Sequence, residues 1–208
     1  MGKQKLFEVD NYTVWQFSGQ NTFFFNSGRT IDADGLPNAY NPDDTSLDNL
    51  EHVGESGNWW GIVTDNGEPD GEPVVQGDDD PYLGYYISRT ALEDETKDET
   101  DPRRYVDSTK IPYIVLPENE NKKFLKKAKV KLGDFADVYS QENDKFAFAI
   151  FAFAIFADTG LEYADSGEEW RLGEGFIALA ELLNIHSSLK ERGTDEGLLF
   201  SISRLRKW

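Results

Sequence analysis

The amino-acid sequence predicts one mainly β domain, and three observations carry this prediction. Its 208 residues fit a single domain, and 38% hydrophobic residues are enough for a sizeable core. Many short apolar stretches are separated by clusters of glycine, asparagine, aspartate and proline, as in sheets built from short strands. Only one segment has convincing helical periodicity. No linker interrupts the pattern, so residues 1–208 are expected to form one domain.

The N-terminal half is expected to contain short strands joined by polar loops. Residues 5–31 alternate between apolar and polar side chains and are interrupted by turn residues, which predicts strands. Residues 32–58 are loop-like, with a short helix expected in 44–54, capped by Asp44 or Thr45 and ended by Gly54. Two further strands are expected at 59–64 and 84–92. If 59–64 is a strand, Trp59 and Trp60 point to opposite faces, and we expect one of them to be buried.

The C-terminal half is expected to supply a buried strand, a hairpin and the helix. Residues 111–117 form a short apolar stretch bounded by prolines, and the lysine-rich residues 118–131 are interpreted as a solvated hairpin or helix. Residues 132–150 are typical of a hairpin that turns at 141–144. In residues 173–185 the apolar positions follow a 3.6-residue period. They are Phe176, Ile177, Leu179, Ala180, Leu182 and Leu183.

A five-residue word, FAFAI, occurs twice in succession at residues 146–155 and leads to Asp158. Alternating Phe and Ala predicts a strand with Phe146, Phe148 and Ile150 on one face. Because the repeat is odd, the second copy places its own large residues on the opposite face. We therefore expect the run to be buried on both faces, to bulge or to bend between sheets, and a bend or bulge is favoured.

Charge excludes several classes of function. The net charge is −18, of which residues 1–100 contribute −16 and residues 101–208 only −2. Such a field repels nucleic acids and anionic membranes and attracts cations, although an acidic surface also serves solubility alone. There is no cysteine, so disulfides and zinc–thiolate clusters are excluded. The longest apolar run is too short to span a bilayer, and residues 1–12 lack the apolar core of a signal peptide.

The chemistry on offer is that of carboxylates. No HExxH, phosphate-binding loop or GxSxG motif is present. Asp32 and Asp34 hint at a calcium loop, but the spacing and the bidentate glutamate are absent. Asp158 closes the apolar strand, where it either caps a turn or acts as a tuned carboxylate, and Glu174 stands at the start of the expected helix. Two carboxylates suffice for glycoside hydrolysis, one as acid and the other as base or nucleophile.

The sequence resembles the chitosanases of glycoside hydrolase family 75. The resemblance rests on TIDADGLPNAYNPDD, NWWGIVTDNGEPDGEPVVQG, GYYISRTALED, DPRRYVDSTKIPYIVLP, residues 132–158 and LGEGFIALAEL. These stretches cover most of residues 29–183 in the family's order. The hairpin at their centre also looks like part of a double-psi β-barrel, a fold shared by expansins and family 45 endoglucanases. The resemblance therefore implies a mainly β, double-psi β-barrel-like single domain with one or two helices.

The resemblance also implies an activity and a site. It implies an endo-chitosanase that hydrolyses β-1,4 bonds between glucosamine residues with inversion, with Asp158 and Glu174 as the catalytic pair. Glu174 is assigned as the acid and Asp158 as the base, although a helix N-terminus would favour a charged Glu174. Neither a cofactor nor a metal is implied; the partner is cationic chitosan, the protein is expected to be a monomer, and the location is extracellular. Candidate substrate-binding residues are Asp32, Asp34, Asn38, Tyr40, Asp43, Asp44, Trp59, Trp60, Asp65, Tyr85 and Tyr86.

Departures from the family leave an alternative open. The family has one copy of the strand word, a proline where Leu161 stands and often a histidine where Asn41 stands, and residues inserted between Asp158 and Glu174 separate the pair further. The alternative is therefore a non-catalytic glucosamine-polymer binding protein on the same scaffold. The second FAFAI copy, next to Asp158, is interpreted as the family's strand and the first copy as an insertion. An acidic β domain with an unrelated ligand is a third interpretation.

Overall fold

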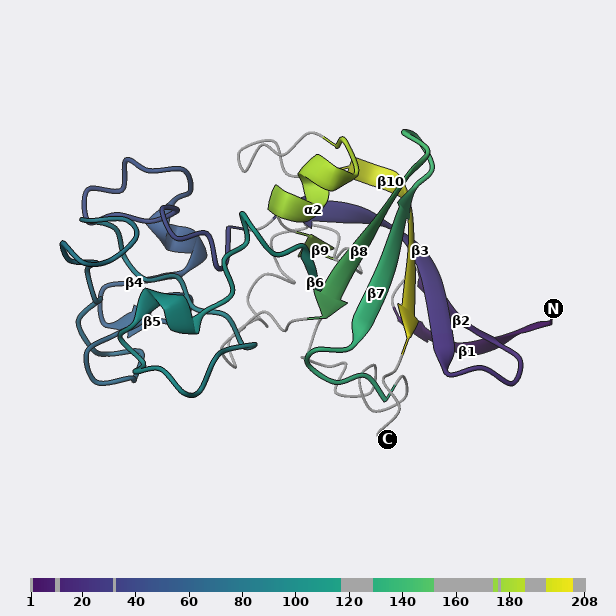
Figure 1. The fold of residues 1–208 in the computed structure, drawn as a ribbon, viewed down its shortest axis with the longest axis horizontal. Coiled ribbons are helices and arrows are strands. Elements are labelled where there is room, and N and C mark those ends of the chain that lie inside the picture. The colour runs from purple at the N-terminus through teal and green to yellow at the C-terminus, as the bar shows by residue number, and fades with distance from the viewer. Residues whose placement is uncertain are drawn as a thin grey trace.

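Eight strands form one mixed sheet in the computed structural model, which describes residues 2–9, 12–31, 33–116, 129–151, 174–175, 177–185 and 194–203. The strand order is β1-β2-β3-β10-β7-β8-β6-β9 (Figure 1). β9 pairs with β6 and also with β3, so the pairings from β3 through β9 close on themselves. The prediction of a mainly β, barrel-like domain is confirmed. The strands are β1 (Lys3–Val9), β2 (Tyr12–Phe17), β3 (Thr22–Ile31), β6 (Tyr113–Val115), β7 (Phe135–Ser140), β8 (Lys145–Phe151), β9 (Glu174–Gly175) and β10 (Thr194–Ser203).

Smaller elements occupy the chain between β3 and β6. They are the 3-10 helices η1 (Leu50–His52) and η2 (Pro102–Arg104) and the two-residue strands β4 (Gly54–Glu55) and β5 (Asn58–Trp59). The strands expected at 59–64 and 84–92 shrink to β5 and isolated bridges such as Ile62 with Ser88. The helix expected at 44–54 is the single turn η1. Dense turn residues on both sides of each apolar stretch leave no room for longer ladders.

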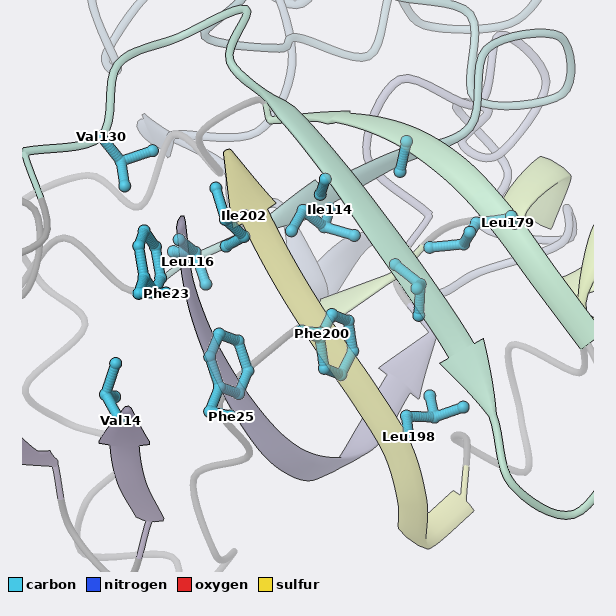
Figure 2. Packing of buried hydrophobic residues seen from close by; sticks show 14 of the residues in the cluster. Val14, Phe23, Phe25, Ile114, Leu116, Val130, Leu179, Leu198, Phe200 and Ile202 are labelled. Carbon is cyan, nitrogen blue, oxygen red and sulfur yellow. The ribbon is translucent and has the colours of Figure 1, made fainter. Parts of the chain in front are cut away.

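The core of the sheet is filled by the inward-facing residues of alternating strand positions. Phe23 and Phe25 of β3 and Phe200 and Ile202 of β10 are fully buried, and the rings of Phe25 and Phe200 stack with centroids 5.0 Å apart (Figure 2). Burial of each such side chain contributes about 1.5–3 kcal/mol. β10 bridges β3 and β7 and was not anticipated from the sequence, in which Gly197 and two serines weaken its strand signal.

The helix is shorter than its periodicity predicts. α2 runs from Ile177 to Leu182, and Leu182 is exposed although it lies in the predicted apolar stripe. Glu174 does not stand at the head of this helix, because it lies in β9, three residues before α2 begins. The placement of Glu174 at a helix N-terminus was therefore wrong. Gly173 and Gly175 on either side disfavour helix and permit the extended backbone that pairs with β3 and β6.

The first FAFAI copy forms β8 and alternates as expected, but with its large residues outside. Ala147 and Ala149 face the core, whereas Phe146 and Phe148 are 72% and 75% exposed. β8 pairs with β7 in continuous register from Phe135–Ile150 to Ser140–Lys145, so this copy contains no bulge. The alanines make room for α2, whose Leu179 and Leu183 belong to the same buried cluster. The second copy beyond Phe151 lies outside the described residues.

Deletion of residues 146–150 is expected to leave a folded protein. The second copy repeats the same five residues, so the shortened chain can place an identical word against β7. We expect the far-UV circular dichroism spectrum to be retained and the melting temperature to stay within a few degrees of wild type. Loss of the cooperative melt would show that both copies are needed for the core.

Candidate functional site

The negative charge of the chain is concentrated in one lobe. Residues 32–112 leave the sheet after β3, return at β6 and form the loops at the left of Figure 1. This acidic lobe holds 21 of the 39 aspartates and glutamates but only 5 of the 21 lysines and arginines, a net of −16. The rest of the chain has a net charge of −2. The field that attracts cations therefore originates on one side of the molecule.

The lobe is attached to the sheet at Gly35. The Gly35 amide donates to Ser88 Oγ (2.9 Å), and its carbonyl oxygen accepts from the amide of Ser108 (3.1 Å). Its φ of +70° suits glycine, and a Cβ here would collide with the carbonyl oxygen of Val106 and lie 2.7 Å from the Tyr113 hydroxyl. Gly35 thus holds its own loop against Ser88 and against residues 106–108, close to Tyr113 at the start of β6.

A carboxylate–aromatic cluster forms part of the lobe surface. The rings of Trp59 and Tyr86 lie 6.4 Å apart between centroids, and both are half-buried. Burial raises the pKa of the Tyr86 hydroxyl, and the negative charges of Glu72 and Asp43 raise it further. Two exposed carboxylates therefore lie close enough to disfavour the phenolate. Such a group of carboxylates and ring faces suits an ammonium ion, which can pair with the acids and stack on the rings.

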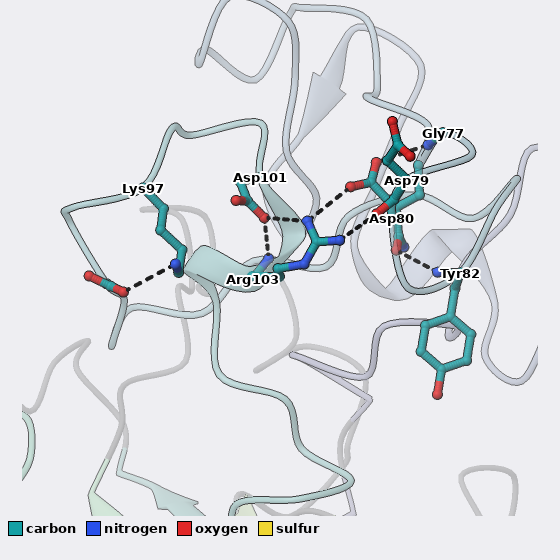
Figure 3. Close-up of polar contacts among 9 residues, drawn as sticks. Gly77, Asp79, Asp80, Tyr82, Lys97, Asp101 and Arg103 are labelled. Atoms are coloured by element: carbon teal, nitrogen blue, oxygen red, sulfur yellow. Dashed lines mark hydrogen bonds and ion pairs between the residues drawn. The ribbon is translucent and has the colours of Figure 1, made fainter.

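Four of the five cations of the lobe, Lys97, Arg103, Arg104 and Lys110, form ion pairs with carboxylates outside this cluster. Arg103 forms ion pairs with Asp80 and Asp101 and donates to the carbonyl oxygen of Asp79 at 2.5 Å (Figure 3). Arg104 donates from two nitrogens to Glu93, at 3.0 and 2.9 Å. Within the described part of the chain, no lysine or arginine forms an ion pair with Asp43 or Glu72. The cluster therefore keeps its negative charge for a ligand.

A buried aspartate organises the loop that carries Asp43. Asp48 is 8% exposed, accepts from the Tyr40 hydroxyl at 3.0 Å and lies 2.7 Å from His52 Nδ1. Burial alone would raise the pKa of Asp48, but the hydrogen bond and charge of His52, together with Tyr40, hold it below its usual range. Asp44 closes the same loop by accepting from the amide of Leu50 at 2.8 Å.

The structure sorts the predicted substrate-binding residues into three groups. Asp43, Trp59 and Tyr86 come together in the cluster, and Asp65 supports it because its backbone and carboxylate bond both backbone groups of Glu72. Trp60, Tyr85 and Asn38 are half-buried in the lobe outside this group. Asp32 lies outside the described residues. The expectation that one of Trp59 and Trp60 is buried was wrong, since both are only partly buried, Trp59 at the end of the two-residue strand β5 and Trp60 in the bend that follows it.

Three predicted contacts serve the lobe's own structure instead. Tyr40 is fully buried with its hydroxyl on Asp48, so its assignment as a ligand contact was wrong. The Asp44 carboxylate is used on the Leu50 amide. The carbonyl oxygen of Asp34 accepts from the Tyr113 hydroxyl at 2.5 Å, which ties the entry of the lobe to β6.

The catalytic pair is placed only in part. Asp158 lies outside the described residues, and of Glu174 the backbone is defined: it opposes Val115 of β6 and Thr30 of β3. β8 and β9 lie on the two sides of β6, so their backbones are about 10 Å apart, two strand spacings. The backbone of Glu174 therefore lies where the chain enters and leaves the acidic lobe. In the sequence, six residues stand between Phe151, the end of β8, and Asp158.

Glu72 and Asp48 were not anticipated from the sequence. Glu72 belongs to the turn-rich stretch DNGEPDGEP, in which its spacing from Asp65 could have indicated a paired carboxylate. Asp48 and His52 are four residues apart, a spacing that brings side chains together on one helical turn. A cavity of about 280 Å³ lies deeper in the lobe, lined in part by Ile87, Tyr105 and Lys110. It is mainly apolar, and Lys110 is paired with Asp107 at 2.6 Å.

Comparison with known proteins leaves the site to be judged on its own geometry. No protein-family model matches the chain, and no curated protein matches it significantly. Among the described residues, no group of three or more histidine, aspartate or glutamate side chains could hold a metal ion. None of the helices in those residues is long and apolar enough to cross a membrane.

Replacement of Asp48 by Asn is expected to destabilise the lobe. The change removes the negative charge of the carboxylate that His52 and Tyr40 both contact. We expect it to lower the free energy of unfolding by about 1–3 kcal/mol and the melting temperature by several degrees. Because the folded-state pKa of Asp48 is lowered, its stabilisation is present at neutral pH and is lost as the pH falls through that value.

Thermal melts at pH 7 and pH 3 measure both effects. The matched control is Glu51→Gln, whose carboxylate is on the same turn but exposed, and it should change stability by less than about 0.5 kcal/mol. The variant should approach wild type at pH 3. A melting temperature equal to wild type at pH 7, or a deficit of equal size at both pH values, would show that Asp48 does not have this role.

Proposed function

We propose that the protein is an endo-chitosanase that cleaves β-1,4 bonds between glucosamine residues with inversion. The observation that carries the proposal is the cluster of Asp43, Glu72, Trp59 and Tyr86, free of described cationic partners, in a lobe with a net charge of −16. A polymer of protonated glucosamine presents an ammonium group and an apolar ring face on each unit. The cluster offers a complement to both features.

The proposed mechanism uses one carboxylic acid and one carboxylate. The acid protonates the glycosidic oxygen while the carboxylate takes a proton from the water that attacks the opposite face of the sugar. Inversion requires carboxyl groups about 6.5–9.5 Å apart. The backbone of Glu174 in β9 and the strand β8 lie on the two sides of β6, about two strand spacings apart. Asp158 is proposed as base and Glu174 as acid, and no cofactor is required.

The position of Glu174 removes one objection to its role. At a helix N-terminus the macrodipole would lower its pKa and oppose an acid function. Glu174 lies in β9 and not in the first turn of α2, so this argument does not apply to it. A general acid needs a raised pKa, which proximity to a second carboxylate can supply in the substrate complex.

Substitution of the catalytic pair tests the reaction. Asp158→Asn and Glu174→Gln are each expected to lower the release of reducing ends from chitosan by about 100-fold or more, because each removes a proton-transfer group. Glu181→Gln, an exposed acid on α2, is the matched control and should keep wild-type activity.

Binding measured on the same variants separates enzyme from binder. The catalytic variants should still bind chitosan. If wild type binds the polymer and never shortens it, the non-catalytic binding protein is the correct alternative. If either carboxylate variant hydrolyses at the wild-type rate, the assignment of the pair is wrong.

Neutralising the cluster tests the substrate site independently of catalysis. The double variant Asp43→Asn/Glu72→Gln is expected to bind chitosan oligosaccharides roughly 2- to 20-fold more weakly near pH 5.5, the range that two exposed ion pairs allow. Isothermal titration calorimetry gives the dissociation constant. Glu55→Gln removes an exposed acid elsewhere in the lobe and should have a smaller effect. Equal affinities for the double variant and the control would exclude the cluster as the site.

A further inference from the structure

The outer surface of the β7–β8 hairpin is aromatic and exposed. Phe135, Phe146 and Phe148 are 51%, 72% and 75% exposed, and Tyr139 stacks on Phe146 with ring centroids 4.4 Å apart. Cross-strand register places Phe135 opposite Ile150 on the same surface. We call these five residues the aromatic face. The proposed function makes no use of it.

This arrangement is the reverse of the usual one, in which a strand buries its large apolar residues and exposes its small ones. β8 turns its two small residues, Ala147 and Ala149, into the core and its two phenylalanines outward. Single exposed apolar residues are common, but a contiguous group of this kind marks an interaction surface. Thr at positions 146 and 148 would also be compatible with a strand and would make this surface polar. The face therefore has the composition of a surface that is covered in use.

The area of the face approaches that of a stable protein interface. The exposed parts of its three phenylalanines equal about two whole rings, or roughly 300–500 Å² at 150–250 Å² per aromatic side chain. A standard interface buries about 800 Å² on each partner. Tyr139, Ile150 and the neighbouring outward residue Leu199 of β10, which pairs with Tyr139, supply much of the remainder.

The distribution of charge indicates which partner can approach. The acidic lobe has a net charge of −16, whereas the remaining residues of the chain comprise 18 acids and 16 bases. Two copies of the chain repel each other strongly through their lobes but weakly through their sheets. The lobe lies at one end of the molecule in Figure 1, and β7, β10 and β3 lie toward the other. Contact through the sheets therefore keeps the two lobes apart.

We propose that the aromatic face binds the same face of a second copy, forming a two-fold symmetric dimer. Packing of sheet on sheet would bring the two sets of rings together at about 10 Å between backbones, as in β-sandwiches. Two described carboxylates meet this surface: Asp137 of β7 lies opposite Phe148, and Asp144 accepts from the Tyr139 hydroxyl at 2.9 Å. The expectation of a monomer is thereby replaced by a reversible dimer. This inference is independent of chitosan hydrolysis.

Sedimentation velocity over a range of protein concentrations tests the dimer. Wild type is expected to show a monomer–dimer equilibrium that strengthens as salt screens the remaining repulsion. Phe146→Ser/Phe148→Ser should raise the dimer dissociation constant by roughly 30-fold or more, the effect of losing interface hot spots. Leu83→Ser is the matched control, because Leu83 is 63% exposed but lies in the acidic lobe, and it should dimerise as wild type does. Circular dichroism confirms that each variant is folded.

Three results would overturn the proposal. Wild type could remain monomeric at several hundred micromolar, the double serine variant could dimerise as wild type does, or wild type could form open-ended oligomers without a dimer plateau. Retention on insoluble chitin that the serine variant loses, with wild type monomeric throughout, would assign the face to sugar rings instead. Chitosan hydrolysis should be unchanged in the serine variant, so failure of the dimer leaves the proposed function untouched.

A cysteine crosslink locates the contact. The chain has no cysteine, so a single introduced thiol can be crosslinked only to the thiol of another copy. Sheets packed about 10 Å apart are too far apart for a direct disulfide, so a short bis-maleimide is used. Asp137→Cys, in the middle of the aromatic face, is expected to be crosslinked by it, and Leu83→Cys in the lobe is not. Crosslinking of Leu83→Cys at the same rate as Asp137→Cys would contradict a dimer formed through this face.

Discussion

The attachment of the acidic lobe at Gly35 is the constraint on which the rest of the structure depends. A loop region with a net charge of −16 tends to expand by self-repulsion, and it contains no long strand ladder or helix to resist this. It is held by buried hydrophobic clusters of its own, such as the one that contains Tyr40 and Ile62, and by close contacts at its base. There Gly35 bonds Ser88 and Ser108 and packs against Val106 where no side chain would fit. The Tyr113 hydroxyl on the carbonyl oxygen of Asp34 joins the same point to β6. The lobe is thus fixed to the sheet at its entry and its exit, with Glu174 of β9 beside both.

Two surfaces of opposite character follow from this plan. The lobe presents carboxylates and ring edges, and its own arginines neutralise Asp80, Asp101 and Glu93 while leaving the cluster around Tyr86 negative. The sheet presents a nearly neutral exterior with exposed rings. The first suits a cationic polymer and the second an apolar contact. Because they lie on separate parts of the chain, the proposed substrate binding and the proposed association of copies would not compete for one surface.

The sequence predicted the sheet better than it predicted the lobe, for physical reasons. Alternation over β7 and β8 and the prolines around β6 are local signals, so these elements were found at nearly their observed bounds. Local signals did not predict which face of β8 is buried. Ala147 faces the core, where α2 packs against β8, and this contact joins residues far apart in the sequence. In the lobe, the resemblance identified Asp43, Trp59 and Tyr86 as candidates. The structure was needed to show that Tyr40 is buried and that Glu72 lies near Tyr86. Helical periodicity predicted Glu174 at the start of a helix, whereas in the structure its backbone pairs with β3 and β6.

The central claim is that the acidic lobe recognises positive charge on a sugar polymer. Titration calorimetry with two oligosaccharides of equal length, one of glucosamine and one of N-acetylglucosamine, tests it at low and high salt. At low salt the glucosamine oligomer is expected to bind more tightly than the N-acetylglucosamine oligomer. This difference in affinity should fall at high salt, because salt screens the charge of the lobe. An N-acetylglucosamine oligomer that binds as tightly, or a glucosamine affinity that does not change with salt, would contradict it.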